Sequence, residues 1–92
     1  MVLEAGQLTD ADYKRLYWAS RRGMLELDLV LMPFAEGPLR ELNAVDQQRY
    51  IDLLESEDTE LFAWFLQRQR PQDPELAAIV DIILAYNKRT AR

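Results

Sequence analysis

The apolar residues of this 92-residue chain recur at helical spacing in several separate short segments. The clearest stripe lies near the C-terminus, where the spacing i, i+3, i+4, i+7 predicts one apolar helix face. Its members are Leu76, Ile79, Val80, Ile83 and Leu84. Asp73-Pro74-Glu75 just before the stripe is a strong helix start, because it combines a capping residue, a proline at the first helical position and an acid in the first turn.

A first helix is predicted from Thr9, whose hydroxyl can cap the helix while Asp12 completes a capping box. Its inward stripe is Tyr13, Leu16, Tyr17 and Ser20. At about 100° per residue, Trp18 lies roughly 140° away from Tyr13 and outside that stripe, among basic residues. Gly23 follows, a residue suited to the left-handed conformation that often ends a helix.

The segment Met24–Met32 is ambiguous, because its first half alternates apolar and acidic residues as a strand does. No other segment reads as a strand, and a lone strand leaves its backbone groups unpaired. We therefore predict a helix that is apolar nearly all round, largely buried, and kinked or stopped at Pro33. Phe34–Leu42, which contains Gly37-Pro38, is predicted to be a loop.

Two more helices are predicted in the second half of the chain. Asn43 can cap one that runs to about Glu55, and Asp58 can cap another that closes at Arg70-Pro71-Gln72. Their inward residues are Tyr50, Leu53 and Leu54 in the first, and Leu61, Phe62, Phe65 and Leu66 in the second. Trp64 falls near the edge of the second stripe, so it either caps the core or extends an outer surface.

Together these segments predict an all-α fold, a single compact bundle of five short helices. The length supports one domain. We assign it to residues 1–92, with a core from about residue 9 to residue 89 and flexible ends. Hydrophobic residues make up 49% of the chain, which is enough for one compact core.

The sequence contains neither histidine nor cysteine. Their absence removes the commonest general base, the commonest metal ligand and every thiolate nucleophile. The glycines are isolated, so no glycine-rich loop is present to cradle a phosphate. These absences exclude hydrolases with Ser-His or Cys-His machinery, zinc proteins, P-loop NTPases and dinucleotide-binding folds. We predict no catalytic residue, no metal site and no stably bound cofactor.

Sixteen acidic and eleven basic residues give a net charge of −5, which argues against nucleic-acid binding. No apolar run approaches the roughly 18–20 residues of a membrane span, and the first residues resemble neither a signal peptide nor a transit peptide. We therefore expect a bacterial cytoplasmic protein that does not insert into membranes.

The charge is unevenly distributed along the chain. Residues 13–25 contain four bases and no acid, whereas residues 50–67 contain five acids and no base. A small protein with one basic and one acidic end can dock on a partner in a fixed orientation. Two solvated helix faces would give the same pattern, and charge alone leaves both interpretations open.

The segment Trp18–Asp28 stands out, because its order places it at an elbow between two helices. Gly23 permits the turn there, and Arg21 and Arg22 suit the negative end of the first helix. Glu26, in the first turn of the next helix, can accept hydrogen bonds from unpaired amides. This structural interpretation does not explain why Trp18 lies outside the inward stripe. Trp and Arg side chains exposed together are typical of protein interfaces.

The same segment, with the sequence WASRRGMLELD, resembles the R-G-x-x-E signature region of the SdhE family. Members of this family are FAD assembly factors for succinate dehydrogenase, also called flavinators. Two further blocks agree at fitting spacing, the Leu-Met-Pro-Phe of residues 31–34 and the block Leu53–Trp64. The resemblance covers about Tyr13 to Asn87, and only the two ends of the chain fall outside it.

The resemblance implies a five-helix protein that binds the flavoprotein subunit of succinate dehydrogenase, and often that of fumarate reductase. It also implies that the protein promotes covalent attachment of FAD to a histidine of that client. Arg22, Gly23 and Glu26 match the functional motif of the family. Arg21, Trp18 and Asp28 lie beside it, and we take all six as candidate partner-binding residues.

A chain without histidine fits a helper rather than an enzyme, because the client must supply the nucleophilic imidazole. We expect Gly23 to let the client backbone approach closely and Arg22 to contact a client carboxylate or carbonyl. Glu26 would pair with a client cation or orient Arg22. We expect the protein to be a monomer that does not hold FAD stably.

Two other functions remain open from the residues alone. Members of the same family have been described as antitoxins, and a small acidic binding module fits that role as well. A small all-α enzyme of the chorismate mutase type needs no histidine either. Its fold uses long helices, which the prolines at positions 33, 38, 71 and 74 make a poor fit here.

Overall fold

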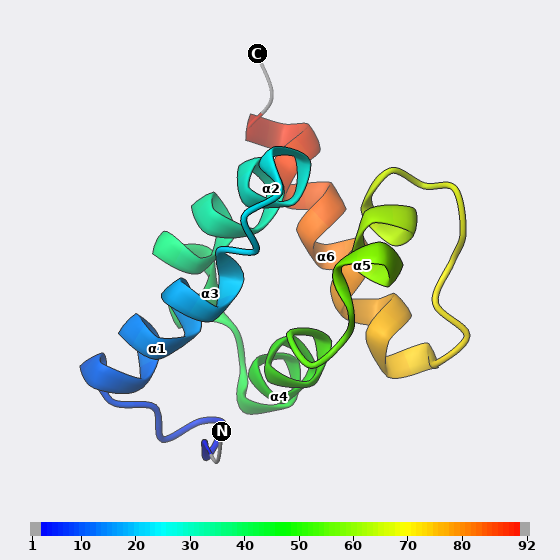
Figure 1. The fold of residues 1–92 in the computed structure, drawn as a ribbon. Helices are drawn as coiled ribbons and strands as arrows, with labels where there is room; N and C mark the ends of the chain where they lie inside the picture. Colours follow the sequence, from blue (N-terminus) through cyan, green and yellow to red (C-terminus); the bar gives the residue numbers. More distant parts are fainter. Residues whose placement is uncertain (1–2, 91–92) are drawn as a thin grey trace.

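The structure, a computed structural model, describes residues 3–90, and this part of the chain is helical with no strand. Its helices are α1 (Asp10–Ser20), α2 (Leu25–Glu36), α3 (Pro38–Glu41), α4 (Ala44–Leu53), α5 (Asp58–Phe65) and α6 (Pro74–Thr90). Helix α2 packs against α1, α3, α5 and α6, and α4 packs against α6 (Figure 1). The predicted all-α bundle is confirmed, with the four-residue α3 as an additional element. Of the flexible ends predicted outside about residues 9–89, residues 1–2 and 91–92 lie outside the described range.

At the starts of α1, α4 and α6, side chains cap the helix where the sequence places capping residues. The hydroxyl of Thr9 accepts from the Asp12 amide at 3.1 Å, and the Asp12 carboxylate accepts from the Thr9 amide at 3.0 Å. Asn43 accepts from the Asp46 amide at 2.8 Å at the start of α4. Asp73 accepts from the amide of residue 75 at 2.8 Å before α6. These bonds satisfy amides that have no partner inside the helices.

The predicted loop Phe34–Leu42 is wrong, because α2 runs through Pro33 to Glu36 and α3 follows. Pro33 lacks the N–H that would bond the Leu29 carbonyl. Leu29 is 63% exposed, so the missing bond falls on the solvent side of the helix. Beyond the proline, Phe34 is 1% exposed, and its burial favours continuing the helix.

The prediction that this apolar segment is largely buried is also wrong on one side. Leu27 and Leu31 are buried, but Leu25 is 66% exposed and Leu29 is 63% exposed. Leu25 and Leu29 are four residues apart, so they share one face of α2. The structure therefore leaves an apolar strip on the solvent side of this helix.

Helix α5 differs from the prediction at both ends. Glu57, not Asp58, is its N-cap, and Glu57 forms a capping box with Glu60. The helix ends at Phe65, because the Gln67 backbone is left-handed (φ 59°) and the next two amides bond back to the Ala63 carbonyl. Of the predicted stripe, Leu61 and Phe65 are buried, Phe62 is half-buried and Leu66 is 40% exposed, whereas Trp64 is buried. No glycine or proline marks this helix end in the sequence.

The core lies where α1, α2, α4, α5 and α6 meet, and one buried polar pair crosses it. Ser20 and Tyr50 are both fully buried, and their hydroxyl oxygens are 2.6 Å apart. The Ser20 hydroxyl donates to the Leu16 carbonyl at 2.7 Å, so the Tyr50 hydroxyl is the donor to Ser20. Burial raises the pKa of Tyr50 from 10.0 to about 12, although the bond to Ser20 and the charge of Arg22 lower it.

No helix in residues 3–90 is long and apolar enough to cross a membrane. The residues before α1 also belong to the packed structure, since Leu3, Ala5 and Leu8 pack against the core. The amide of Gly6 donates to the Gln47 side chain at 2.8 Å, which ties this segment to α4.

The Tyr50 hydroxyl predicts a loss of stability in alkali. An unfolded chain ionises Tyr50 above pH 10, whereas the folded chain keeps it neutral until about pH 12. The stabilisation is therefore complete below pH 10 and is lost as the pH rises from 10 to 12, by about 2–3 kcal/mol. Urea unfolding of the wild type and Tyr50→Phe at pH 9, 10, 11 and 12 measures it. Equal pH slopes for the two proteins would contradict the assignment.

Candidate functional site

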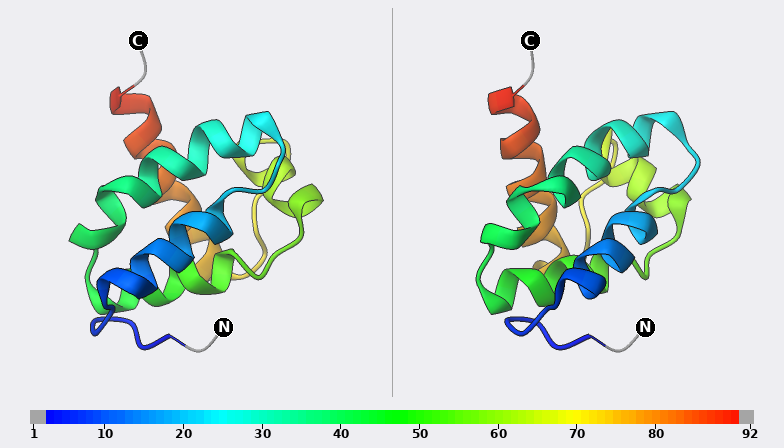
Figure 2. Two further views of the ribbon diagram at one scale, coloured as in Figure 1. Left: turned by 60° about the vertical axis from the view of Figure 1, so that its left-hand side comes forward. Right: turned by 90° about the vertical axis from the view of Figure 1, so that its left-hand side faces the viewer.

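The connection between α1 and α2, residues Arg21–Met24, forms the elbow predicted from the sequence. Figure 2 shows this connection at one end of the molecule, beside the link between α4 and α5. Two candidate residues, Arg22 and Asp28, bond within the chain, and the remaining four are exposed. The six therefore divide into an inner and an outer set.

Arg22 joins the elbow to the α4–α5 link through its guanidinium. Its Nε donates to Asp58 Oδ1 at 2.8 Å, and its Nη2 donates to the Ser56 carbonyl at 2.8 Å. Its Nη1 donates to the carbonyls of Ala19 at 3.1 Å and Leu54 at 3.0 Å. These bonds use four of the five N–H groups of a guanidinium, and the side chain is only 17% exposed.

The position of this guanidinium follows from the carbonyls that helix ends leave unpaired. Ala19 lies in the last turn of α1, and Leu54 is the C-cap of α4. A cation at the C-terminal ends of two helices also meets the negative ends of both helix dipoles. We expected Arg22 to contact a client, but in this structure it braces the elbow against its own chain. We call Arg22, Asp58 and the three carbonyls the Arg22 brace.

Asp28 holds the backbone of the elbow from the other side. Its Oδ1 accepts from the Arg22 amide at 2.8 Å, across the turn that Gly23 makes. Glu26 takes no such part: it is exposed and has no hydrogen bond or ion pair to any residue of the range 3–90. The structure therefore shows Glu26 neither accepting from first-turn amides nor orienting Arg22.

Gly23 lies at the tip of the elbow with a left-handed backbone (φ 81°). Residues with a Cβ adopt this conformation at a cost of roughly 1 kcal/mol, which explains a glycine here. A Cβ built at Gly23 would meet nothing within 4 Å, so the space beside it belongs to the solvent. Neither its N–H nor its carbonyl has a partner among the described residues. Its backbone is thus open to another molecule.

The outer set consists of exposed residues at the elbow and in the adjoining helix turns. Trp18 is 60% exposed at the end of α1, as its place outside the inward stripe predicts. Arg21 and Glu26 are exposed as well. Sequence reasoning missed Leu25 and Leu29, which lie next to Glu26 on the outer face of α2. Their i, i+4 spacing beside an exposed acid was the available signal. We call these exposed residues the elbow surface: Trp18, Arg21, Gly23, Leu25, Glu26 and Leu29.

Among residues 3–90, no three His, Cys, Asp or Glu side chains are placed to hold a metal ion. The elbow surface offers the unpaired backbone of Gly23, the cation of Arg21, the anion of Glu26 and apolar side chains. These groups suit recognition of another macromolecule, in which Trp and Arg side chains commonly carry much of the binding energy.

Comparison with known proteins identifies relatives over most of the chain. Residues 14–87 match the family model described as flavinator of succinate dehydrogenase. The FAD assembly factor SdhE of Pseudomonas aeruginosa is 51% identical over 75 residues, which are 82% of this chain and 89% of that protein. The SdhE of Photobacterium profundum is 44% identical over 85 residues, 92% of this chain and 97% of that protein. The solution structure of a UPF0350 protein, 45% identical, superimposes with a TM-score of 0.71 over 92% of both chains.

The Arg22 brace predicts that Arg22 stabilises the fold. Arg22→Ala leaves three carbonyls and Asp58 without their donor, so we expect the free energy of unfolding to fall by about 2–3 kcal/mol. Asp58→Asn should cost less, and a double-mutant cycle should give a coupling of about 1 kcal/mol between Arg22 and Asp58. Urea denaturation followed by circular dichroism measures these values.

Arg21→Ala is the matched control, because Arg21 precedes Arg22 in the chain but is exposed. Its effect should remain within about 0.5 kcal/mol. If Arg22→Ala is as stable as Arg21→Ala, Arg22 does not brace the elbow.

Proposed function

The chain belongs to the family of flavinators of succinate dehydrogenase, and we propose that it binds the flavoprotein subunit of that enzyme and promotes covalent attachment of FAD to a histidine there. Relatives that carry the name FAD assembly factor match 82% and 92% of the chain, including the whole elbow. The same proposal extends to the related flavoprotein of fumarate reductase.

One observation carries the assignment of the docking site: the exposed Gly23 backbone on a braced elbow. A loop that is held on both sides loses little conformational entropy on binding. The Arg22 brace and the Asp28 bond hold the turn, while the unpaired backbone groups of Gly23 face outward. The elbow surface would insert at a junction between domains of the flavoprotein and hold it in a state competent for attachment.

The inner and outer residues then have different roles. Arg22 and Asp28 act as positioning residues, since their polar groups bond within the chain. Trp18, Arg21 and Glu26 contact the flavoprotein, with Leu25 and Leu29 extending the surface along α2. One elbow suffices for one flavoprotein, so we propose that a monomer acts. We place this encounter in the bacterial cytoplasm, since the relatives named above are bacterial proteins.

A helper fits the chemistry better than an enzyme or an antitoxin. The chain has no histidine, so the nucleophilic imidazole belongs to the flavoprotein. FAD remains bound to the flavoprotein and is not held stably by this chain. What the elbow contributes is orientation of reacting groups that already share one protein, and correct orientation can supply several kcal/mol of a barrier. The names of the relatives support this role over either alternative.

Substitutions at Gly23 test the insertion of the elbow. Gly23→Arg places a long side chain in the space that the flavoprotein would occupy, so covalent FAD should fall about tenfold or more. Gly23→Asn is the matched control for the backbone, because asparagine tolerates the left-handed conformation better than most residues. Its effect should be smaller. Flavin fluorescence of the co-expressed flavoprotein subunit in a denaturing gel measures only the covalently attached FAD.

Normal flavinylation with a folded Gly23→Arg protein would show that the elbow does not insert. If Gly23→Arg does not fold, Gly23→Ser and Gly23→Asn replace it. At similar stability, the loss of covalent FAD should be larger for the bulkier asparagine than for serine.

Substitutions in the outer set test the contact residues separately. Glu26→Gln and Trp18→Ala remove groups that have no hydrogen bond within the described chain. The free energy of unfolding should change by no more than about 0.5 kcal/mol for Glu26→Gln. For Trp18→Ala, which also loses an edge contact with the Tyr17 ring at 5.4 Å, it should fall by about 1 kcal/mol. Their affinities for the flavoprotein subunit should each fall by about tenfold, which isothermal titration calorimetry measures. Unchanged affinity in both variants would remove these residues from the contact surface.

A further inference from the structure

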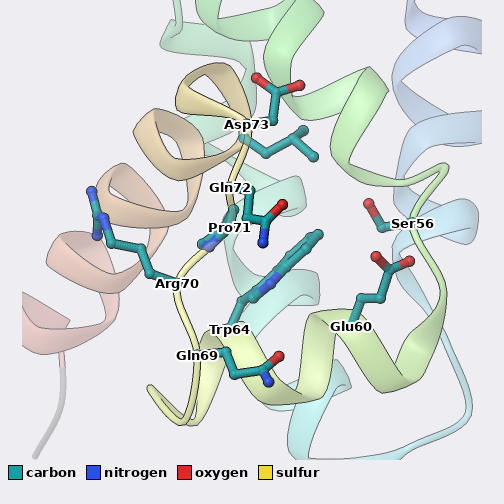
Figure 3. Close-up of a pocket in the computed structure, with 9 residues that line it drawn as sticks. Ser56, Glu60, Trp64, Gln69, Arg70, Pro71, Gln72 and Asp73 are labelled. Atoms are coloured by element: carbon teal, nitrogen blue, oxygen red, sulfur yellow. The ribbon is translucent and has the colours of Figure 1, made fainter.

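A cavity of about 600 Å³ lies between α5 and the link from α5 to α6, and it includes none of the six candidate site residues. Figure 3 shows the Trp64 ring in its middle, with Glu60 on one side and the link on the other. The residues that matter here are Ser56, Glu60, Trp64, Gln69, Gln72 and Asp73. Its volume is in the range of cavities that bind ligands.

Trp64 presents a hydrogen-bond donor that the described chain does not use. The side chain is 8% exposed, and its indole N–H has no acceptor among residues 3–90. Every fully buried side-chain nitrogen or oxygen in that range has a hydrogen-bond partner. The unpaired indole N–H is therefore not fully buried, and it is open to the space beside the ring. A donor in a nearly buried side chain normally has an acceptor. A bound molecule can therefore supply an acceptor for this N–H.

The cavity also carries negative charge without a counter-ion. Glu60 accepts from the Glu57 amide at 3.2 Å and Asp73 accepts from the amide of residue 75 at 2.8 Å, and neither pairs with a cation of the described chain. Arg70, the only base in the lining, pairs with Asp81 at 2.7 Å and points away from Trp64 in Figure 3. The cavity therefore attracts a cation and repels phosphate groups.

We propose that this cavity binds a short extended segment of the flavoprotein partner that carries an arginine or lysine. The basic side chain pairs with Glu60, and a backbone carbonyl of the segment accepts the indole N–H of Trp64. Asp73, on the other side of Trp64, adds to the negative charge that attracts the segment. The side-chain amides of Gln69 and Gln72 can donate to the carbonyls and accept from the N–H groups of an extended segment. The negative charge disfavours the pyrophosphate of FAD as the occupant. This inference rests on the proposed function, because it takes the flavoprotein as the partner.

The position of the cavity lets one partner reach both sites. Ser56 lines the cavity, and its carbonyl accepts from Arg22 Nη2 in the brace. The cavity thus begins at the residue that anchors the elbow. A partner on the elbow surface has this cavity within reach along the α4–α5 link, and two linked contacts raise the overall affinity.

Binding of the FAD-free flavoprotein subunit to the full chain tests the proposal by isothermal titration calorimetry. Glu60→Gln keeps the shape and the bond to the Glu57 amide but removes the charge, and it should weaken binding about tenfold. Asp73→Asn keeps a good helix cap and should weaken binding about threefold or more. Trp64→Phe keeps an aromatic ring but removes the N–H, and it should weaken binding about fivefold. Glu41→Gln, at an exposed acid on α3, is the matched control and should stay within about twofold.

The outcomes separate this inference from the proposed function. If the wild type binds but Glu60→Gln and Asp73→Asn bind as tightly as Glu41→Gln, the cavity is not a contact and the proposed function stands. If the wild type does not bind, both fail. The Glu60 and Asp73 variants decide the matter if Trp64→Phe does not fold.

Titration of free FAD, followed by the fluorescence of Trp64 in a Trp18→Phe background, distinguishes the other occupant. After correction for light absorbed by FAD, the proposal expects no saturable quenching at FAD concentrations up to roughly 1 mM, the weak end of the affinity scale. Saturable quenching that Glu60→Gln strengthens would identify a flavin site and overturn the proposal.

Discussion

The guanidinium of Arg22 is the interaction on which the shape of the site depends. It lies where the ends of α1 and α4 meet the start of α5, and it donates to the carbonyls of Ala19, Leu54 and Ser56 and to the carboxylate of Asp58. Without a donor there, helix ends would leave unpaired carbonyls beside the core. Because all four bonds come from one side chain, the elbow and the α4–α5 link are held as one unit. The turn at Gly23 is thereby presented to solvent in a fixed position.

This arrangement explains how two separate sequence blocks depend on one another. Arg22 belongs to the block around the elbow, and Asp58 belongs to the block that begins at Leu53. Their ion pair at 2.8 Å joins the two blocks in space. The residues that hold the elbow point inward, and those left outside include the glycine, a tryptophan, charges of both signs and two leucines. A surface that mixes charge with exposed apolar side chains on a rigid support is typical of a docking site.

The sequence was sufficient wherever local chemistry decides the outcome. The caps at Thr9, Asn43 and Asp73, the inward stripes of α1, α4 and α6 and the left-handed Gly23 all follow from neighbouring residues. It was insufficient where contacts between residues distant in the chain decide the local structure. Asp58 looks like a helix cap, but Arg22 takes its carboxylate and Glu57 caps the helix instead. Pro33 looks like a helix end until the burial of Phe34 is known. The roles of Arg22 and Trp64 likewise depend on segments that only the fold brings near.

The central claim is that the braced elbow meets the flavoprotein. Hydrogen–deuterium exchange of the chain, alone and mixed with the FAD-free flavoprotein subunit, tests this directly, since exchange reports the protection of individual backbone segments. The account predicts that peptides covering residues 21–26 exchange more slowly in the mixture, because the unpaired Gly23 amide becomes covered. Protection elsewhere on the chain with unchanged exchange across the elbow would contradict it.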